Sequence, residues 1–227
     1  MFGQKTNLLR PYFTFLILAP LVLFAALYVS ESDETKPAAT QSYRAAPFDY
    51  YLLSLTWTPG FCSNARNDSL PSLCGRNSKP RFIVHGLWPQ REKDWPEFCA
   101  SPPPKDESVF DAQKDLLSSA SAARHQWQKH GSCSGLPPDA YFAAMHETFE
   151  GVTLPQLWND RVHISLKDLR TMVERANPQL PKNAIAIICN RQMLSEIRIC
   201  FGKDLKPRSC ARNVQDRCAK RGLITLR

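Results

Sequence analysis

The most apolar part of the chain is an uncharged run, Pro11–Ser30, that no polar face interrupts. As an α-helix it would be about 30 Å long, which matches the hydrocarbon core of a bilayer. Lys5 and Arg10 precede the run and acidic residues follow it, so the rest of the chain is expected outside the cytoplasm. We therefore predict a signal-anchor or a signal peptide over residues 1–30. The length of the run, and the lack of a clean cleavage site at Ala25–Leu27, favour an uncleaved transmembrane anchor.

Residues 31–47 form a second segment, rich in Ser, Thr, Ala and Pro and without an apolar period. This composition predicts a flexible linker. From Phe48 the pattern changes to that of a folded protein, and we expect one domain over residues 48–227.

The domain contains short apolar and aromatic runs that predict strands, and segments with a helical apolar period. We expect strands at residues 48–57, 81–88, 184–189 and 196–201, with a short turn at 190–193. We expect helices at residues 108–119, 120–130, 139–150 and 165–176. Gly151 stands where the third helix would end, and Ser165 with Asp168 is a capping signal for the fourth. Because strands and helices do not alternate regularly, we predict an α+β fold, with a mainly antiparallel sheet packed with helices.

Composition narrows the class of protein. The chain has 227 residues, of which 43% are hydrophobic and 22% charged, and these values exclude a wholly disordered, collagen-like or coiled-coil protein. The formal net charge is +8, and the excess lies in residues 1–30 and 203–227, whereas the region between them is balanced. The bulk of the domain is therefore close to neutral and its C-terminal stretch is basic.

Eight cysteines are many for a cytosolic enzyme, and their number is even. Outside the cytoplasm thiols oxidise and disulfides persist, so the cysteine count agrees with export. Eight cysteines allow 105 pairings, among which the residues alone do not choose. No C-x-x-C pair is present, which argues against a structural zinc site.

Three of the five histidines lie in two dense segments. The first segment is F-I-V-H-G-L-W-P, residues 82–89, which places His85 near the end of a predicted strand. The second is H-Q-W-Q-K-H-G-S-C, residues 125–133, at the end of a predicted helix.

The second segment predicts a polar helix face. At about 100° per residue, one side of the helix would carry His125, Gln126, Lys129 and His130. Burying two imidazoles, an ammonium and an amide together is costly, so the face indicates a function unless it is a solvated surface.

These residue types favour one kind of chemistry. Histidines can act as general acid and base at mild pH, and a lysine beside them can stabilise negative charge that develops in a transition state. There is no acidic cluster for magnesium or calcium, and His125 and His130 do not have the spacing of a zinc-binding helix. We therefore expect no metal and no cofactor, and cleavage of a phosphodiester fits best.

At this point the two segments resemble the active-site segments of the ribonuclease T2 family, the acid, transferase-type endoribonucleases. They occur in the family's order and about 40 residues apart, and the resemblance extends from Phe48 to Cys218. It implies an α+β fold and metal-independent cleavage of single-stranded RNA through a 2′,3′-cyclic phosphate. DNA lacks the 2′-hydroxyl nucleophile and would not be cleaved.

The resemblance also implies a role for each residue. His130 matches the general base that removes the 2′-hydroxyl proton, and His85 matches the general acid that protonates the leaving 5′-oxygen. Lys129 matches the group that stabilises the pentacoordinate phosphorane, and His125 matches a phosphate contact. Gln126 replaces the usual glutamate. Its amide can bond a phosphate oxygen but cannot exchange a proton, so the replacement bears on rate and pH optimum.

Base recognition is expected from aromatic residues. Trp88 and Trp95 can stack on bases, although either can equally be a core residue. The segment W-P-E-F-C, residues 95–99, resembles a family segment whose aromatic residue lines a base pocket. Gln90 stands where some members have aspartate, so a base preference does not transfer.

The resemblance further implies a disulfide pairing: Cys62–Cys74, Cys99–Cys133, Cys189–Cys218 and Cys200–Cys210. The second bridge would tie the base-pocket segment to the end of the helix, which favours a rigid site. The last two would fasten the basic C-terminal stretch, which either attracts RNA phosphates or is an ordinary solvated surface.

The sequence thus predicts an exported endoribonuclease that acts on single-stranded RNA as a monomer. It would be periplasmic or extracellular, held at a membrane by its N-terminal helix or secreted if that helix is cleaved. Two other functions stay open: a non-catalytic RNA- or partner-binding protein on the same fold, which Gln126 weakly favours, and a disulfide-rich interaction module whose histidines are incidental.

Overall fold

The computed structural model describes residues 42–64, 71–75, 78–79, 81–155, 157, 163–219 and 221–226. The predicted membrane or signal segment, residues 1–30, lies outside this part, as does the predicted linker up to residue 41. Among the described residues, no helix has the length and apolar character needed to cross a membrane.

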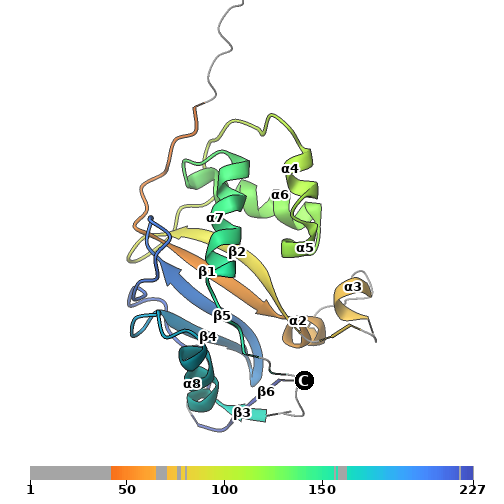
Figure 1. The fold of residues 1–227 in the computed structure, drawn as a ribbon, viewed down its shortest axis with the longest axis vertical. Helices are drawn as coiled ribbons and strands as arrows, with labels where there is room; N and C mark the ends of the chain where they lie inside the picture. The colour runs from red at the N-terminus through yellow and green to blue at the C-terminus, as the bar shows by residue number, and fades with distance from the viewer. Residues whose placement is uncertain are drawn as a thin grey trace, which may run out of the picture. The chain divides into compact units, whose positions relative to one another are not determined.

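The centre of the domain is a six-stranded mixed sheet with the order β2-β1-β5-β6-β3, in which β4 also pairs with β5. Neighbouring strands are antiparallel except for β5 and β6, which pair in parallel at Met193 and Thr225. The α+β prediction is confirmed, with one parallel pairing in the otherwise antiparallel sheet (Figure 1). The strands are β1 (Tyr50–Trp57), β2 (Phe82–Gln90), β3 (His163–Ser165), β4 (Ile185–Asn190), β5 (Met193–Phe201) and β6 (Leu223–Thr225).

Three of the predicted helices are present as α6, α7 and α8. Ser119 and Ser165 cap α6 and α8, because each hydroxyl accepts a hydrogen bond from the backbone N–H three residues later. The described α-helices are α2 (Thr58–Asn64), α3 (Pro71–Cys74), α4 (Ser108–Asp111), α5 (Lys114–Leu117), α6 (Ala120–Lys129), α7 (Pro138–Glu150) and α8 (Leu166–Ala176).

The prediction of one helix over residues 108–119 is wrong, because this segment forms two short helices, α4 and α5. Gln113 lies between them, and its buried amide donates to the carbonyl of Val109 and pairs through Oε1 with Nε2 of His146 on α7. Ser118 then takes a left-handed conformation with φ 67° after α5. The backbone leaves helical geometry at Gln113, with φ −97° and ψ 4°, and the side chain of this residue contacts another helix.

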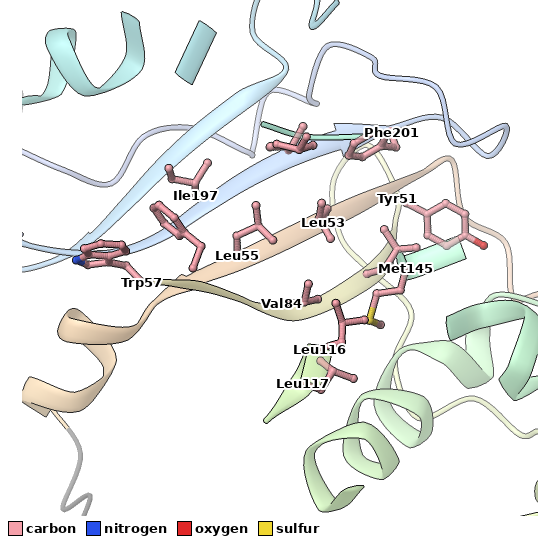
Figure 2. Packing of buried hydrophobic residues seen from close by; sticks show 14 of the residues in the cluster. Tyr51, Leu53, Leu55, Trp57, Val84, Leu116, Leu117, Met145, Ile197 and Phe201 are labelled. Carbon is pink, nitrogen blue, oxygen red and sulfur yellow. The ribbon is translucent and has the colours of Figure 1, made fainter. Parts of the chain in front are cut away.

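The main core lies between one face of the sheet and the helices. Tyr51, Leu53, Leu55 and Trp57 alternate along β1 and belong to the cluster that also contains Met145 of α7. Figure 2 shows Leu53 and Leu55 between Ile197 on one side and Val84 and Leu116 on the other. This packing holds β1, β2 and β5 in place, so the side chains on their opposite face have a rigid backbone beneath them.

That opposite face has a smaller apolar cluster of Tyr50, Leu52, Cys200 and Ala211, against which Val214 packs. Unlike the core face, it presents polar groups of β2 and β5. Both predicted histidine segments meet on this side of the sheet.

The structure contains the four disulfides that the resemblance implied, and it leaves no free cysteine among the described residues. The segment just before Phe48 has no regular secondary structure, but it contacts the domain. The Tyr43 ring packs edge-on against Trp127 at 6.0 Å, and the N–H of Ala46 donates to the carbonyl of Cys133. The packed region therefore begins before Phe48.

Candidate active site

Strand β2 carries the first predicted segment and has an irregular register at His85. Ser54 of β1 pairs with Gly86 and Leu55 pairs with Val84, so His85 has no partner on β1. Such a bulge adds one residue to the strand and turns the following side chains over. His85 and Trp88, three positions apart, consequently line the same cavity instead of opposite faces of the sheet.

The second segment ends helix α6 differently from the prediction. The helix stops at Lys129, and His130 is its C-cap, with φ −121° and ψ −50°, before a 3₁₀ turn at Gly131–Cys133. Gly131 permits this turn, because a Cβ there would lie 2.8 Å from Cδ1 of Tyr141. Trp127 is buried in the main core, which fixes the rotation of α6 about its axis.

One cavity of about 420 Å³ brings the two segments together. All the predicted catalytic and substrate-binding side chains line it: His85, Trp88, Gln90, Trp95, His125, Gln126, Lys129 and His130. The remaining lining residues are Leu52, Lys93, Arg198, Asn213, Val214, Gln215 and Arg217.

Trp88 contacts both imidazoles. Its ring centroid lies 5.0 Å from that of His85, edge-on, and 5.1 Å from that of His130, stacked. The guanidinium of Arg198 lies 5.4 Å from the centroid of the same ring. Trp88 is therefore already packed against charged or polar neighbours, and it supports both histidine rings.

Gln126, the departure from the family pattern, is bonded to Trp88. The indole Nε1–H of Trp88 donates to Oε1 of Gln126 at 2.9 Å, and the Gln126 side chain is buried. Gly86 lies directly against this pair, and a Cβ at position 86 would collide with both Gln126 Oε1 and Trp88 Nε1. The glycine in the first segment thus lets helix α6 approach β2.

His130 is held in its neutral form. Burial, followed by the positive charges at Lys129, His85 and His125, lowers its pKa to about 3. Its Nδ1 is buried without a hydrogen-bond partner, so Nε2 is the nitrogen left to face the cavity. A neutral imidazole of this kind has a free lone pair on one ring nitrogen and can accept a proton there.

His85 is more exposed and is paired with an acid that sequence reasoning missed. Its Nδ1 lies 2.8 Å from Oε1 of Glu196 on β5, and Arg198 binds the other carboxylate oxygen at 2.7 Å. Burial alone would raise the pKa of Glu196, but the hydrogen bond from His85 and the charge of Arg198 lower it to about 2. The carboxylate therefore orients the His85 ring through Nδ1 and leaves Nε2 of that ring for the cavity.

A signal for Glu196 and Arg198 is nevertheless present in the sequence. They alternate with Ile197 and Ile199 in a predicted strand, so they share the face opposite the core. Two opposite charges on one face of a mostly buried strand are costly to keep unless they have partners.

Lys129 and His125 lie at the other side of the cavity, beside segment 95–99. Lys129 Nζ is 3.6 Å from Oε2 of Glu97, and the His125 ring packs edge-on against Phe98 at 6.4 Å. The N–H of Phe98 donates to the carbonyl of Lys129, and the Cys99–Cys133 bridge joins the same two segments. The disulfide and the backbone bond fix the base-pocket segment to the end of α6.

Trp95 and Gln90, two of the three predicted base-contacting residues, differ in exposure. Trp95 is 52% exposed and offers its ring to solvent at the rim, whereas Gln90 is buried and donates to the carbonyl of Pro89. Among the described residues, no group of three or more His, Cys, Asp or Glu side chains is arranged to hold a metal ion.

Comparisons with known proteins match most of the described domain. The model of the ribonuclease T2 family matches residues 48–210. The chain is 35% identical over 178 residues to a probable ribonuclease of Haemophilus influenzae, covering 73% of this chain and 62% of that protein. It is 38% identical over 94 residues to a ribonuclease of Aeromonas hydrophila, covering 40% of each. The chain thus spans less than two thirds of the length of these two relatives.

Solved structures share the fold at lower identity. An RNase-related protein from Calystegia sepium has a TM-score of 0.64 at 19% identity, and the match covers 80% of this chain and 98% of that one. A variant of RNase MC1 in complex with 5′-UMP has a TM-score of 0.63 at 20% identity, with 77% and 97% covered.

Proposed function

Because the chain belongs to the ribonuclease T2 family, we propose that it is an endoribonuclease that cleaves single-stranded RNA, without a metal ion, through a 2′,3′-cyclic phosphate. The observation that carries the proposal is that His85 and His130 both pack against Trp88, in one cavity with Lys129.

In the proposed reaction, His130 takes the proton of the 2′-hydroxyl while the 2′-oxygen forms a bond to phosphorus. The bond between phosphorus and the 5′-oxygen breaks, and His85 gives a proton to that oxygen, which leaves a 2′,3′-cyclic phosphate and a 5′-hydroxyl end. Lys129 stabilises the charge on the phosphorane and His125 contacts the phosphate. Trp95 and Gln90 would contact the bases.

The electrostatics of the two histidines support this division of roles. His130, with a pKa lowered to about 3 by burial and neighbouring positive charge, is available as a base. His85 donates Nδ1–H to the Glu196 carboxylate, which orients the ring and leaves its other nitrogen for the leaving group. Glu196 is in this proposal a positioning residue, since it acts on the substrate only through His85.

A second function, RNA binding without cleavage, has one observation in its favour. Gln126 cannot transfer a proton, and its Oε1 is already occupied by the indole of Trp88. This function needs the same cavity but not the acid and base roles of the two histidines. The two functions therefore differ in their products: the first yields RNA fragments and the second leaves the RNA intact.

The protein, incubated in EDTA with a single-stranded RNA, is expected to produce fragments that end in 2′,3′-cyclic phosphate. The reason is that the attacking nucleophile belongs to the substrate and the proton carriers are side chains. Mass spectrometry of the fragments checks the ends, and an RNA methylated at every 2′-oxygen is the matched uncleavable control. Retention of intact RNA, with binding, would instead support the second function.

We further propose that the domain is exported and anchored by residues 11–30. Four disulfides among the described residues support an oxidising compartment, and the charge pattern around the apolar run supports this orientation.

Cell fractionation is expected to recover the protein at full size in membranes. It should resist extraction with salt, because a membrane-spanning helix is held by apolar contacts with lipid, which salt does not weaken. External protease should digest the domain in cells made permeable at the outer surface. A shortened, freely soluble form would show cleavage instead of anchoring, and a cytoplasmic protein with reduced cysteines would contradict export.

A further inference from the structure

The loop between Cys210 and Cys218 forms one wall of the cavity. The proposed reaction assigns no role to the residues of this loop. Asn213, Val214, Gln215 and Arg217 of this loop line the cavity together with the histidines. The loop belongs to the basic C-terminal stretch. From the sequence, this stretch was expected either to attract RNA phosphates or to be an ordinary solvated surface.

This loop is fastened at several points. Disulfides to Cys200 and Cys189 hold its two ends. Asp216 accepts a hydrogen bond from the N–H of Ile187 at 2.8 Å and pairs with Arg170 at 2.6 Å, while Val214 packs on the apolar cluster beneath the cavity. Asn213, Gln215 and Arg217 remain exposed. The backbone is thus fixed while these side chains stay available to a ligand.

Arg217 lies on the side of the cavity where His85 is located. Its N–H donates to the carbonyl of Ile187, and it forms a parallel bridge with Ile188, the residue of β4 that pairs with Glu196. Two strand spacings separate Arg217 from Glu196, or about 10 Å between backbones. Arg198 is paired with Glu196, whereas no carboxylate of the described residues pairs with Arg217.

We infer that the Cys210–Cys218 loop is a substrate-binding subsite in which Arg217 binds a backbone phosphate of RNA on the leaving-group side of the cleaved bond. The inference rests on the proposed function, because the role of His85 as the acid sets the direction of the strand. RNA beyond the leaving 5′-oxygen continues past His85 toward the loop. An unpaired guanidinium on a rigid backbone suits a phosphate there. It can bind two phosphate oxygens at once, and it loses little conformational entropy when it does so.

The test compares substrates that differ by one phosphate. A dinucleoside monophosphate has only the scissile phosphate. A trinucleotide with 2′-deoxyribose at its middle position is cleaved only at its first bond, so it is extended on the 3′ side and adds one phosphate beyond the leaving oxygen. Arg217→Gln is expected to lower kcat/KM about 10-fold for the 3′-extended trinucleotide and less than about 2-fold for the dinucleotide. It should also reduce the slope of log affinity against log salt by about 0.7, the value for one phosphate contact on a single strand.

Two other variants are matched controls. Arg212→Gln removes the same charge from the same loop, but Arg212 does not line the cavity, so both substrates should be cleaved as by the wild type. Arg217→Lys keeps the charge and should keep the salt slope. Circular dichroism and a thiol count confirm that each variant has folded and formed its four disulfides.

The outcomes separate this inference from the proposed function. Equal loss on both substrates, no loss on either, or a loss confined to a 5′-extended trinucleotide would overturn the assignment of Arg217. A wild-type protein that cleaves none of them would refute the enzymatic proposal alone. In that case, affinity for a trinucleotide with 2′-deoxyribose at the scissile position still decides whether Arg217 binds the added phosphate.

Discussion

His85→Ala is expected to lower kcat/KM for ordinary single-stranded RNA by about 10³-fold, within the range that one general acid contributes. His85 faces the cavity at 44% side-chain exposure and lies outside the main core, so its removal leaves the fold in place. The loss should nearly vanish on a substrate with sulfur in place of the leaving 5′-oxygen. A thiolate leaves without a proton, because thiols are far stronger acids than alcohols. Cleavage rates of the two substrates, measured side by side, check this.

Glu196→Gln serves as an intermediate variant in the same assay. Replacing the carboxylate weakens the hydrogen bond that orients His85, so the rate should fall by about 10-fold or more on ordinary RNA. Glu174→Gln, which neutralises an acid of a distant ion pair on α8, is the control and should leave the rate unchanged. Full activity of His85→Ala on ordinary RNA would remove His85 from the mechanism.

The predicted site was largely readable from local patterns, because each histidine segment is short and contiguous. The strand around His85 and the helix before His130 were both expected from sequence periodicity. That these segments meet is a consequence of the β2–β1–β5 sheet and of Trp127, which is buried in the main core and sets the rotation of α6. Periodicity gives the faces of single elements but not their mutual placement.

Other features depend on contacts between distant residues and had no local signal. The bulge at His85 shows only in the register with Ser54 and Leu55 of β1. The break between α4 and α5 lies at Gln113, whose Oε1 accepts a hydrogen bond from His146 on another helix. Strands β3 and β6 have three residues each, too few for an alternating pattern to be recognised.

The site also makes stability depend on pH. The pKa of His130 is about 3 in the folded protein, whereas an unfolded histidine has its ordinary value of about 6.5. Between these pH values the unfolded chain binds a proton that the folded one does not, so stability falls as pH decreases from 6.5 toward 3. The pKa of Glu196 is lowered to about 2, so its carboxylate stabilises the fold when the pH is above the ordinary pKa of a glutamate. That contribution is lost as the pH falls toward 2. Both groups make the fold less stable in acid.

His130→Ala is expected to abolish cleavage, with a loss of at least about 10³-fold that sulfur at the leaving position does not rescue, because the base acts on the nucleophile instead. The same variant should show a shallower fall of unfolding free energy with acid, by up to about 1.4 kcal/mol per pH unit between pH 6 and 4, since one buried neutral imidazole is gone. Denaturant titrations at several pH values measure this slope. His163→Ala, at an exposed histidine on β3, is the control and should keep both activity and slope. A His130→Ala protein that cleaves RNA, or that the sulfur substrate restores, would show that His130 is not the base. An unchanged slope would show that its imidazole is not buried in the neutral form, and the wild-type rate would then fall in acid near the ordinary histidine value instead of near pH 3.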